Sequence, residues 1–182
     1  NAQVMWPRQL VEDVRNVLGK EDILALDNWL YKVWFARNYK TYSPNTLLLD
    51  NALATMWAWV ASWLEAKRIN NDKNVVVVTW DWGLVMNLWD LETVVRLWVD
   101  LTIVVLNNYS YWMIKWKQTG ADMPEWWLDF WNPDFVTLAK SFGWKWYKVE
   151  NKNYFRAVLE AANKEKWLKI IDLKFDYPVE IK

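Results

Sequence analysis

The chain has 182 residues, and its 22 Lys and Arg residues are balanced by 22 Asp and Glu residues. This length predicts a single domain over residues 1–182, and the zero net charge argues against a nucleic-acid-binding protein, which usually carries a basic excess. Because the chain contains no Cys and no His, it has no disulfides, no thiolate or imidazole catalysis and no zinc site built on those ligands; any metal must be held by oxygen atoms.

Two further features of the sequence concern its cellular location and its unusual content of Trp and Gly. No apolar run reaches the roughly 18 residues of a membrane span and the first residues do not resemble a signal peptide, so we expect a cytoplasmic protein that does not contact membranes. The chain has 18 Trp and only 4 Gly. Average usage would give about 13 Gly in a chain of this length.

Helical and strand patterns alternate along the first half of the chain. Apolar residues recur at helical spacing after Pro7 and up to Gly19. The pattern then predicts, in order, a strand at residues 23–27, a helix at 30–39, a strand at 46–49 and a long helix at 53–69. An unbroken β-branched run follows at residues 75–79, which is typical of a strand covered on both faces of a parallel sheet.

The second half continues the alternation. A helix is predicted at residues 88–97, a second central strand at 101–106, a helix that opens at Pro133 after a cap at Asn132, a helix near 153–164, and strands at 145–149 and 169–173. Residues 119–131 form a long loop that is either a functional lid or an ordered surface excursion. The repetition predicts an α/β fold: a three-layer α/β/α sandwich with a mostly parallel sheet of about six strands.

Polar residues follow both central strands. Trp80-Asp81-Trp82-Gly83 comes after the first, and Asn107-Asn108 comes after the second. Ligands of parallel α/β sheets bind outside the carboxyl ends of the strands. An Asp carboxylate and an Asn amide oxygen on neighbouring strands are able to hold one divalent ion, and that ion can carry a diphosphate.

At these residues the chain resembles the cofactor-diphosphate domain of thiamine-diphosphate enzymes, in the branch of acetolactate synthase and related 2-oxo-acid decarboxylases. That family's motif is Gly-Asp-Gly followed by Asn-Asn, which stands here as Trp80-Asp81-Trp82 with Asn107-Asn108. The similarity continues through residues 52–67, 87–108, 109–118 and 129–146.

The resemblance implies thiamine diphosphate and Mg²⁺ as cofactors. Asp81 and Asn108 would ligate Mg²⁺ through their side chains, and Ser110 through its backbone carbonyl. Met56 would support the bent cofactor, and the main chain from Ala54 would face its aminopyrimidine ring. The segment that begins at Asp27 and Asn28 would lie beside the diphosphate.

The resemblance assigns no catalytic residue to this chain. The family's activating glutamate lies on another domain, supplied by a neighbouring subunit, and the chain corresponds to the last of three domains. It therefore implies a homo-oligomer, with a dimer as the simplest closed form. It also implies that the chain alone does not catalyse decarboxylation.

Trp stands at many positions where the family usually has Gly. We count eleven such positions, 29, 57, 59, 80, 82, 98, 112, 127, 131, 146 and 167, and Tyr109 is a further case. The replacement follows the identity of the residue more than its location, which favours an engineered or computed sequence. Gly commonly serves where φ is positive, so we expect strain at these sites, including 80 and 82.

These substitutions leave three functions open. The first is a thiamine-diphosphate domain that has lost cofactor binding, because indoles at 80 and 82 cover the backbone that a diphosphate needs. The second is a designed scaffold without a ligand, and the third is a binding module for aromatic ligands. For the scaffold we predict one contacting cluster of Trp29, Trp57, Trp80, Trp82 and Trp112 in the cofactor crevice.

Overall fold

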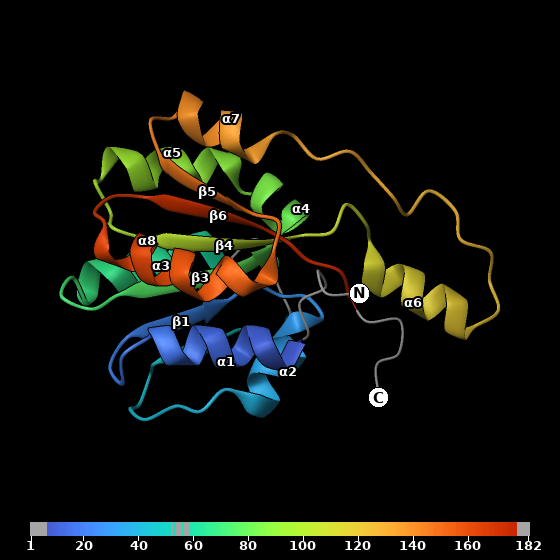
Figure 1. Cartoon of the computed structure of the whole chain (residues 1–182), viewed down its shortest axis with the longest axis horizontal. Helices are drawn as coiled ribbons and strands as arrows, with labels where there is room; N and C mark the ends of the chain where they lie inside the picture. The colour runs from blue at the N-terminus through green and yellow to red at the C-terminus, as the bar shows by residue number, and fades with distance from the viewer. Residues whose placement is uncertain (1–6, 52, 54–55, 57–58, 178–182) are drawn as a thin grey trace.

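Six parallel strands form the central sheet, in the order β2-β1-β3-β4-β6-β5 (Figure 1). The computed structural model describes residues 7–51, 53, 56 and 59–177. The strands are β1 (Ile23–Leu26), β2 (Leu47–Leu49), β3 (Val75–Trp80), β4 (Thr102–Asn107), β5 (Lys145–Val149) and β6 (Lys169–Lys174). The two β-branched runs form β3 and β4 at the centre, which confirms their prediction as central strands.

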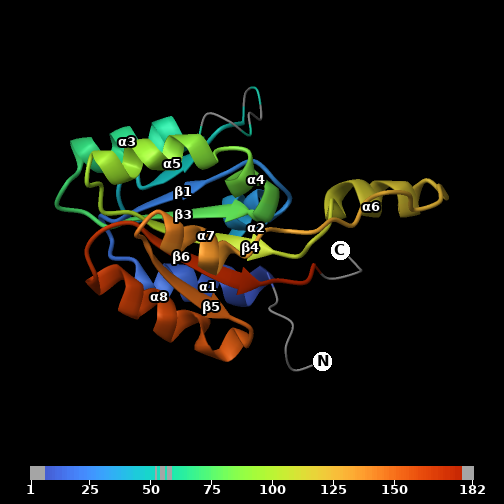
Figure 2. The ribbon, with the colours of Figure 1, turned by 90° about the horizontal axis from the view of Figure 1, so that it is seen from above.

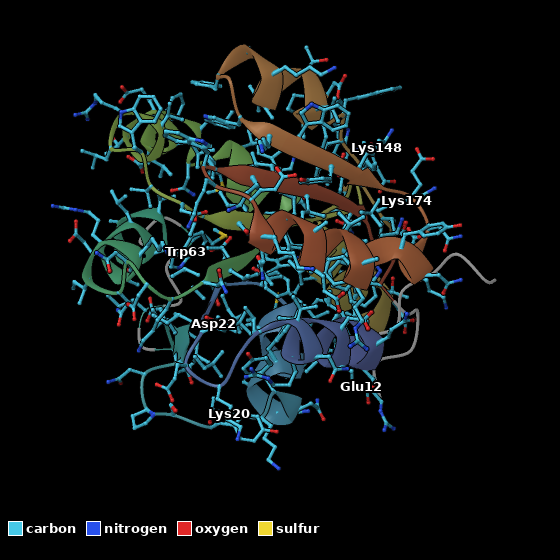
Figure 3. All side chains as sticks on the ribbon, turned by 60° about the vertical axis from the view of Figure 1, so that its left-hand side comes forward. Glu12, Lys20, Asp22, Trp63, Lys148 and Lys174 are labelled. Carbon is cyan, nitrogen blue, oxygen red and sulfur yellow. The ribbon has the colours of Figure 1, made fainter. Side chains whose placement is uncertain are left out.

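Helices cover both faces of this sheet (Figure 2). They are α1 (Pro7–Val17), α2 (Tyr31–Asn38), α3 (Trp59–Ile69), α4 (Asp81–Val85), α5 (Leu88–Arg96), α6 (Trp112–Gly120), α7 (Phe135–Ser141) and α8 (Phe155–Lys164), with a 3₁₀ turn at η1 (Lys152–Tyr154). Side chains of α1, α2 and α8 pack on one face, and those of α3, α5 and α7 pack on the other. The three-layer α/β/α sandwich is confirmed.

Alternate residues of the central strands enter the two cores. Val76 and Val78 of β3 face α1, α2 and α8, whereas Val75 and Val77 face α3 and α5. All six residues of β3 and all six of β4 are buried. A strand buried on both faces does not alternate between polar and apolar residues, which is why the sequence there contains continuous β-branched runs.

Three local expectations about helices need correction. The helix α4 begins at Asp81 directly after β3, and α6 was not predicted at all. Asn132 does not cap α7: Asp134 does, because its carboxylate accepts from the backbone N–H of Val136 and Thr137. The Asn132 side chain is engaged with Asp81 instead.

The segment 109–131 leaves the body of the molecule as an arm that carries α6 (Figures 1 and 2). Its two ends are clasped, because Tyr111 N–H donates to Leu128 and Phe130 N–H donates to Tyr109. Lys115 pairs with Glu125 further along, at 2.8 Å. Residues 119 and 120 end α6, and residues 121–131 form the returning half of this arm.

Backbone strain lies at some of the replaced positions and not at others. Trp98, Tyr109, Trp127 and Trp167 have φ values of 55°, 57°, 56° and 83°, in the left-handed region that favours Gly. Trp80, by contrast, is extended with φ of −92°, and Trp82 lies within α4. The expectation of left-handed strain at 80 and 82 is wrong, because β3 runs straight into a helix there.

Within the described part of the chain, no helix combines the length and the apolar character needed to cross a membrane.

Candidate metal and cofactor site

Asp81 lies directly after β3 and accepts hydrogen bonds from residues that follow β4. As the first residue of α4, it is fully buried. Its Oδ1 accepts from Trp82 N–H at 2.9 Å, while Oδ2 accepts from the backbone N–H groups of Asn108 and Tyr109, at 3.2 and 2.9 Å. The predicted meeting of Asp81 with the segment after β4 is therefore present.

A second layer of polar side chains surrounds this carboxylate. Asn132 Nδ2 donates to Asp81 Oδ2 at 2.8 Å and to Asn107 Oδ1 at 2.7 Å, and Asn107 Nδ2 donates to Asp172 on β6 at 2.9 Å. Burial raises the pKa of both Asp81 and Asp172 despite these hydrogen bonds. Sequence reasoning missed the role of Asn132, since a single Asn before Pro133 carries no signal of a contact with β3.

Several oxygen atoms of the residues after β4 and of Asn132 have no hydrogen-bond donor among the described residues. They are Asn108 Oδ1, Ser110 Oγ and Asn132 Oδ1, and all three are buried. Asn108 and Ser110 also line a hollow of about 220 Å³, together with Lys115, Asp129 and Asp176, whereas Asp81 is not among its lining residues. A buried oxygen without a donor is costly unless a cation or water meets it, so the pattern is suited to a ligand.

These residues fit a hard divalent ion. Mg²⁺ takes oxygen ligands from carboxylates, amides and carbonyls, and usually keeps several waters, for which the hollow has room. Asp81 Oδ1 accepts one hydrogen bond and keeps a lone pair. No group of three or more Asp or Glu side chains is found among the described residues, so the ion would depend on the amide and hydroxyl or carbonyl oxygens as well.

Asp27 and Asn28 lie at the carboxyl end of β1, beside β3. Asp27 Oδ2 accepts from Thr79 Oγ1 at 3.0 Å, and burial raises the pKa of Asp27 to about 7. Lys32 donates to Asn28 Oδ1 at 2.6 Å and to the Asp50 carbonyl at 2.8 Å. Both predicted residues are thus at the correct edge of the sheet, where they form a buried polar cluster separate from that of Asp81.

The remaining site residue that the structure describes is Met56. Its side chain packs against the core on the α1, α2 and α8 face, and its carbonyl accepts from Asn87 Nδ2 at 3.2 Å. Ala54 and Trp57 lie outside the described residues. The role of Met56 as a cofactor support stays a prediction.

Indoles and other rings gather at this edge in two groups. In the first, Trp29 stacks on Trp80 with ring centroids 4.1 Å apart, and Tyr111 contacts both Trp80 and Trp82. In the second, Trp112 stacks on Tyr177 at 4.9 Å. The predicted single cluster is correct for Trp29, Trp80 and Trp82, whereas Trp112 contacts other rings because it points from the start of α6.

Comparison with known proteins gives one consistent result. The family model "Thiamine pyrophosphate enzyme, C-terminal TPP binding domain" matches residues 30–173. The chain is 28% identical over 171 residues to the acetolactate synthase of Bacillus subtilis (strain 168), covering 94% of this chain and 30% of that protein. It is 27% identical to a probable acetolactate synthase large subunit of Methanococcus aeolicus, covering 86% of this chain and 27% of that protein.

A solved structure supports the fold. The Rhodococcus jostii RHA1 thiamine diphosphate-dependent 4-hydroxybenzoylformate decarboxylase superposes with a TM-score of 0.86 over 99% of this chain and 34% of that chain, at 16% identity. The chain thus spans about a third of the length of the relatives that it matches.

Proposed function

Since this chain belongs to the family of C-terminal TPP-binding domains of thiamine pyrophosphate enzymes, we propose that it corresponds to the domain that holds Mg²⁺ and the cofactor diphosphate in an acetolactate-synthase-type enzyme. The observation that carries the proposal is that the buried Asp81 accepts hydrogen bonds from the backbone of Asn108 and Tyr109, and that Asn108 Oδ1 has no donor. On this proposal residues 1–182 are one domain of a cytoplasmic enzyme.

On this proposal the residues around Asp81 would have distinct roles in binding the metal ion. Asn108 Oδ1 and Asp81 Oδ1 would be the side-chain ligands, and Ser110 would add its carbonyl. Asn132 would position Asp81, because its amide holds the carboxylate from the side of α7. When bound, thiamine diphosphate supplies the electron sink for cleavage next to a 2-oxo group; the protein binds, orients and shields it.

We further infer that this chain keeps the metal end of the site and has lost the diphosphate end. A diphosphate needs open backbone N–H groups with no side chain over them. Here the Trp29 and Trp80 rings stack where β1 and β3 end, and Trp82 carries a further indole in the turn after β3. The chain would therefore not bind thiamine diphosphate at micromolar concentration and would not release CO₂ from pyruvate alone.

The same stacking favours a second function, a scaffold in which indoles fill the crevice. An engineered or computed origin would account for it. Trp98, Trp127 and Trp167 hold left-handed φ values, in which Gly is the usual residue. A rule that replaced Gly by Trp at positions of every kind would produce this pattern.

Calorimetric titration tests the proposal. Thiamine diphosphate with Mg²⁺ should give no heat with the unmodified chain and saturable binding with the double variant Trp80→Gly/Trp82→Gly. Adding Asp81→Ala to that double variant should abolish the binding again. Tight binding by the unmodified chain would contradict the loss of the diphosphate end, and a folded double variant that never binds would contradict the cofactor-domain assignment.

A further inference from the structure

The described residues form a larger hollow at the opposite edge of the sheet. It has a volume of about 520 Å³ and lies where the chain enters β4, β5 and β6. Trp98, Phe142, Trp144 and Trp167 line it, along with aliphatic side chains such as Val95 and Leu168. We call it the amino-edge pocket, because Asp81 and the proposed metal site lie at the carboxyl ends of the same strands.

Its aromatic rings form two pairs. Trp98 and Trp167 have centroids 4.2 Å apart, and Phe142 stacks on Trp144 at 4.5 Å with an interplanar angle of 16°. The rings are unequally covered: Trp144 is 6% exposed, whereas Trp98 is 70% and Trp167 is 47% exposed. Trp144 is therefore buried at the base of the pocket, while Trp98 and Trp167 leave part of their ring surface exposed, and a ligand could cover that surface.

The backbone holds these rings in position at some energetic expense. Trp98, Gly143 and Trp167 all have positive φ, with values of 55°, 74° and 83°. A β-carbon at Gly143 would have no atom within 4 Å, so the space beside this residue is open. Two strained indoles left half in water gain little from burial, and a ligand that covered them would supply the missing contact.

The polar groups of the pocket restrict the chemistry of a ligand. Its single charged lining residue, Arg96, already pairs with Glu92 at 3.1 Å. The indole N–H of Trp144 is buried and has no acceptor among the described residues. The pocket therefore lacks a free charge, and the unpartnered Trp144 N–H lies beneath its surface.

From these features we propose that the amino-edge pocket binds a flat, uncharged molecule of two fused aromatic rings. The volume lies within the range of about 300–1,000 Å³ typical of small-molecule sites. The Trp98 and Trp167 rings are inclined at 59° to each other, so the ligand would stack on the exposed face of one indole and meet the edge of the other, and these contacts would supply the affinity. This site is independent of the cofactor proposal, because it lies at the other edge of the sheet.

The test uses 2-naphthol as the probe and calorimetry as the readout. We expect saturable binding to the intact chain and at least tenfold weaker binding to Trp98→Gly/Trp167→Gly. Gly suits both positive-φ positions, so this variant should fold; circular dichroism checks that it does. The matched control is Trp127→Gly, which relieves the same kind of backbone strain on the arm and should leave the affinity unchanged.

A second measurement distinguishes aromatic recognition from nonspecific hydrophobic adsorption. Decahydro-2-naphthol, which has the same skeleton without aromaticity, should bind about tenfold more weakly, and the Trp144 indole N–H signal, assigned by its loss in Trp144→Phe, should shift with 2-naphthol. The proposal is overturned by absence of binding at millimolar probe, by undiminished binding to Trp98→Gly/Trp167→Gly, by an equal loss in Trp127→Gly, or by equal affinity for the saturated analogue.

Discussion

Gly83 shows how tightly the turn after β3 is built. A β-carbon at this position would lie 2.2 Å from Asp27 Oδ2, 2.6 Å from Thr79 Oγ1 and 2.7 Å from Trp80 Cδ1. All three neighbours are buried, so none can move away freely. The Gly is needed here for close approach, since its φ is not in the left-handed region.

We therefore expect Gly83→Ala to lower the free energy of unfolding by about 3 kcal/mol, the upper part of the range for overpacked cores. The matched control is Gly120→Ala in α6, where a β-carbon would have nothing within 4 Å. That variant should be unchanged or up to about 1 kcal/mol more stable. Urea denaturation measures both, and equal effects would refute the close-approach explanation.

Asp27 makes a second prediction at the residue scale. Its folded pKa of about 7 exceeds the usual value of about 3.9, because burial disfavours the carboxylate. Between these values the folded chain holds a proton that the unfolded chain has released, so this residue makes the protein less stable as pH rises from about 4 to about 7, by at most about 1.4 kcal/mol per pH unit.

Urea denaturation at pH 5, 6 and 7 checks this, with Asp27→Asn as the comparison. The unmodified chain should lose more stability across the series than the variant does. Buried Asp81 and Asp172 contribute in the same direction in both proteins, so the difference isolates Asp27. Parallel curves would show that Asp27 titrates in its ordinary range.

Site residues were predictable from sequence only where the backbone places them. Asp81 and Asn108 follow two neighbouring parallel strands, and the common direction of those strands brings them together. Asn132 reaches the same carboxylate from a distant loop, and neither spacing nor periodicity relates it to β3. Contacts that follow from strand order could thus be predicted from the sequence, whereas contacts that depend on the path of a loop could not.

At the scale of elements, the end of β3 depends on packed rings. Trp80 is 2% exposed and stacks on Trp29, and its extended backbone carries no left-handed strain. Trp80→Gly/Trp82→Gly should lower the free energy of unfolding by at least about 3–5 kcal/mol, the usual effect of deleting one buried ring. Thermal melting without ligand measures the effect.

The control for that variant is Trp89→Ala in α5, where the side chain is 76% exposed. Its melting temperature should hardly change. A double variant that melts at a higher temperature than the parent would mean that the Trp80 and Trp82 rings destabilise the folded state.

Strands were easier to predict than the short or exposed helices. β3 and β4 begin with unbroken β-branched runs, at residues 75–79 and 102–105, and both strands are buried on both faces. The helix α6 buries no residue completely, so it lacks the apolar stripe that identifies a helix in sequence. α4 has only five residues, too few for any periodicity to appear.

At the scale of the whole molecule, the arm presents apolar surface away from the body. Trp126 and Trp127 are 75% and 83% exposed, and Ile114, Trp116 and Met123 are also exposed. Large exposed apolar patches usually mark an interaction site. We propose that two copies associate through their arms as a C₂ dimer, in keeping with the dimer that the family resemblance implies.

Light scattering at high protein concentration should give twice the chain mass of 22.0 kDa. Trp116→Glu/Trp126→Glu on the arm should restore the monomer, whereas Trp89→Glu on α5 should leave the dimer intact. A parent that stays monomeric, or an arm variant that still dimerises, would contradict association through the arm.

The strand order has a consequence for how the chain is made. β5 is synthesised before β6, yet β5 pairs with β6, and β6 lies between it and β4. Until residues 169–174 leave the ribosome, the nascent chain therefore keeps the Ile103–Val105 stretch of β4 without its second neighbour, while β5 has no strand to join. An unpaired apolar strand edge is a template for aggregation. Because β6 joins β4 to β5, a translational pause before residues 169–174 would leave the edge of β4 unpaired.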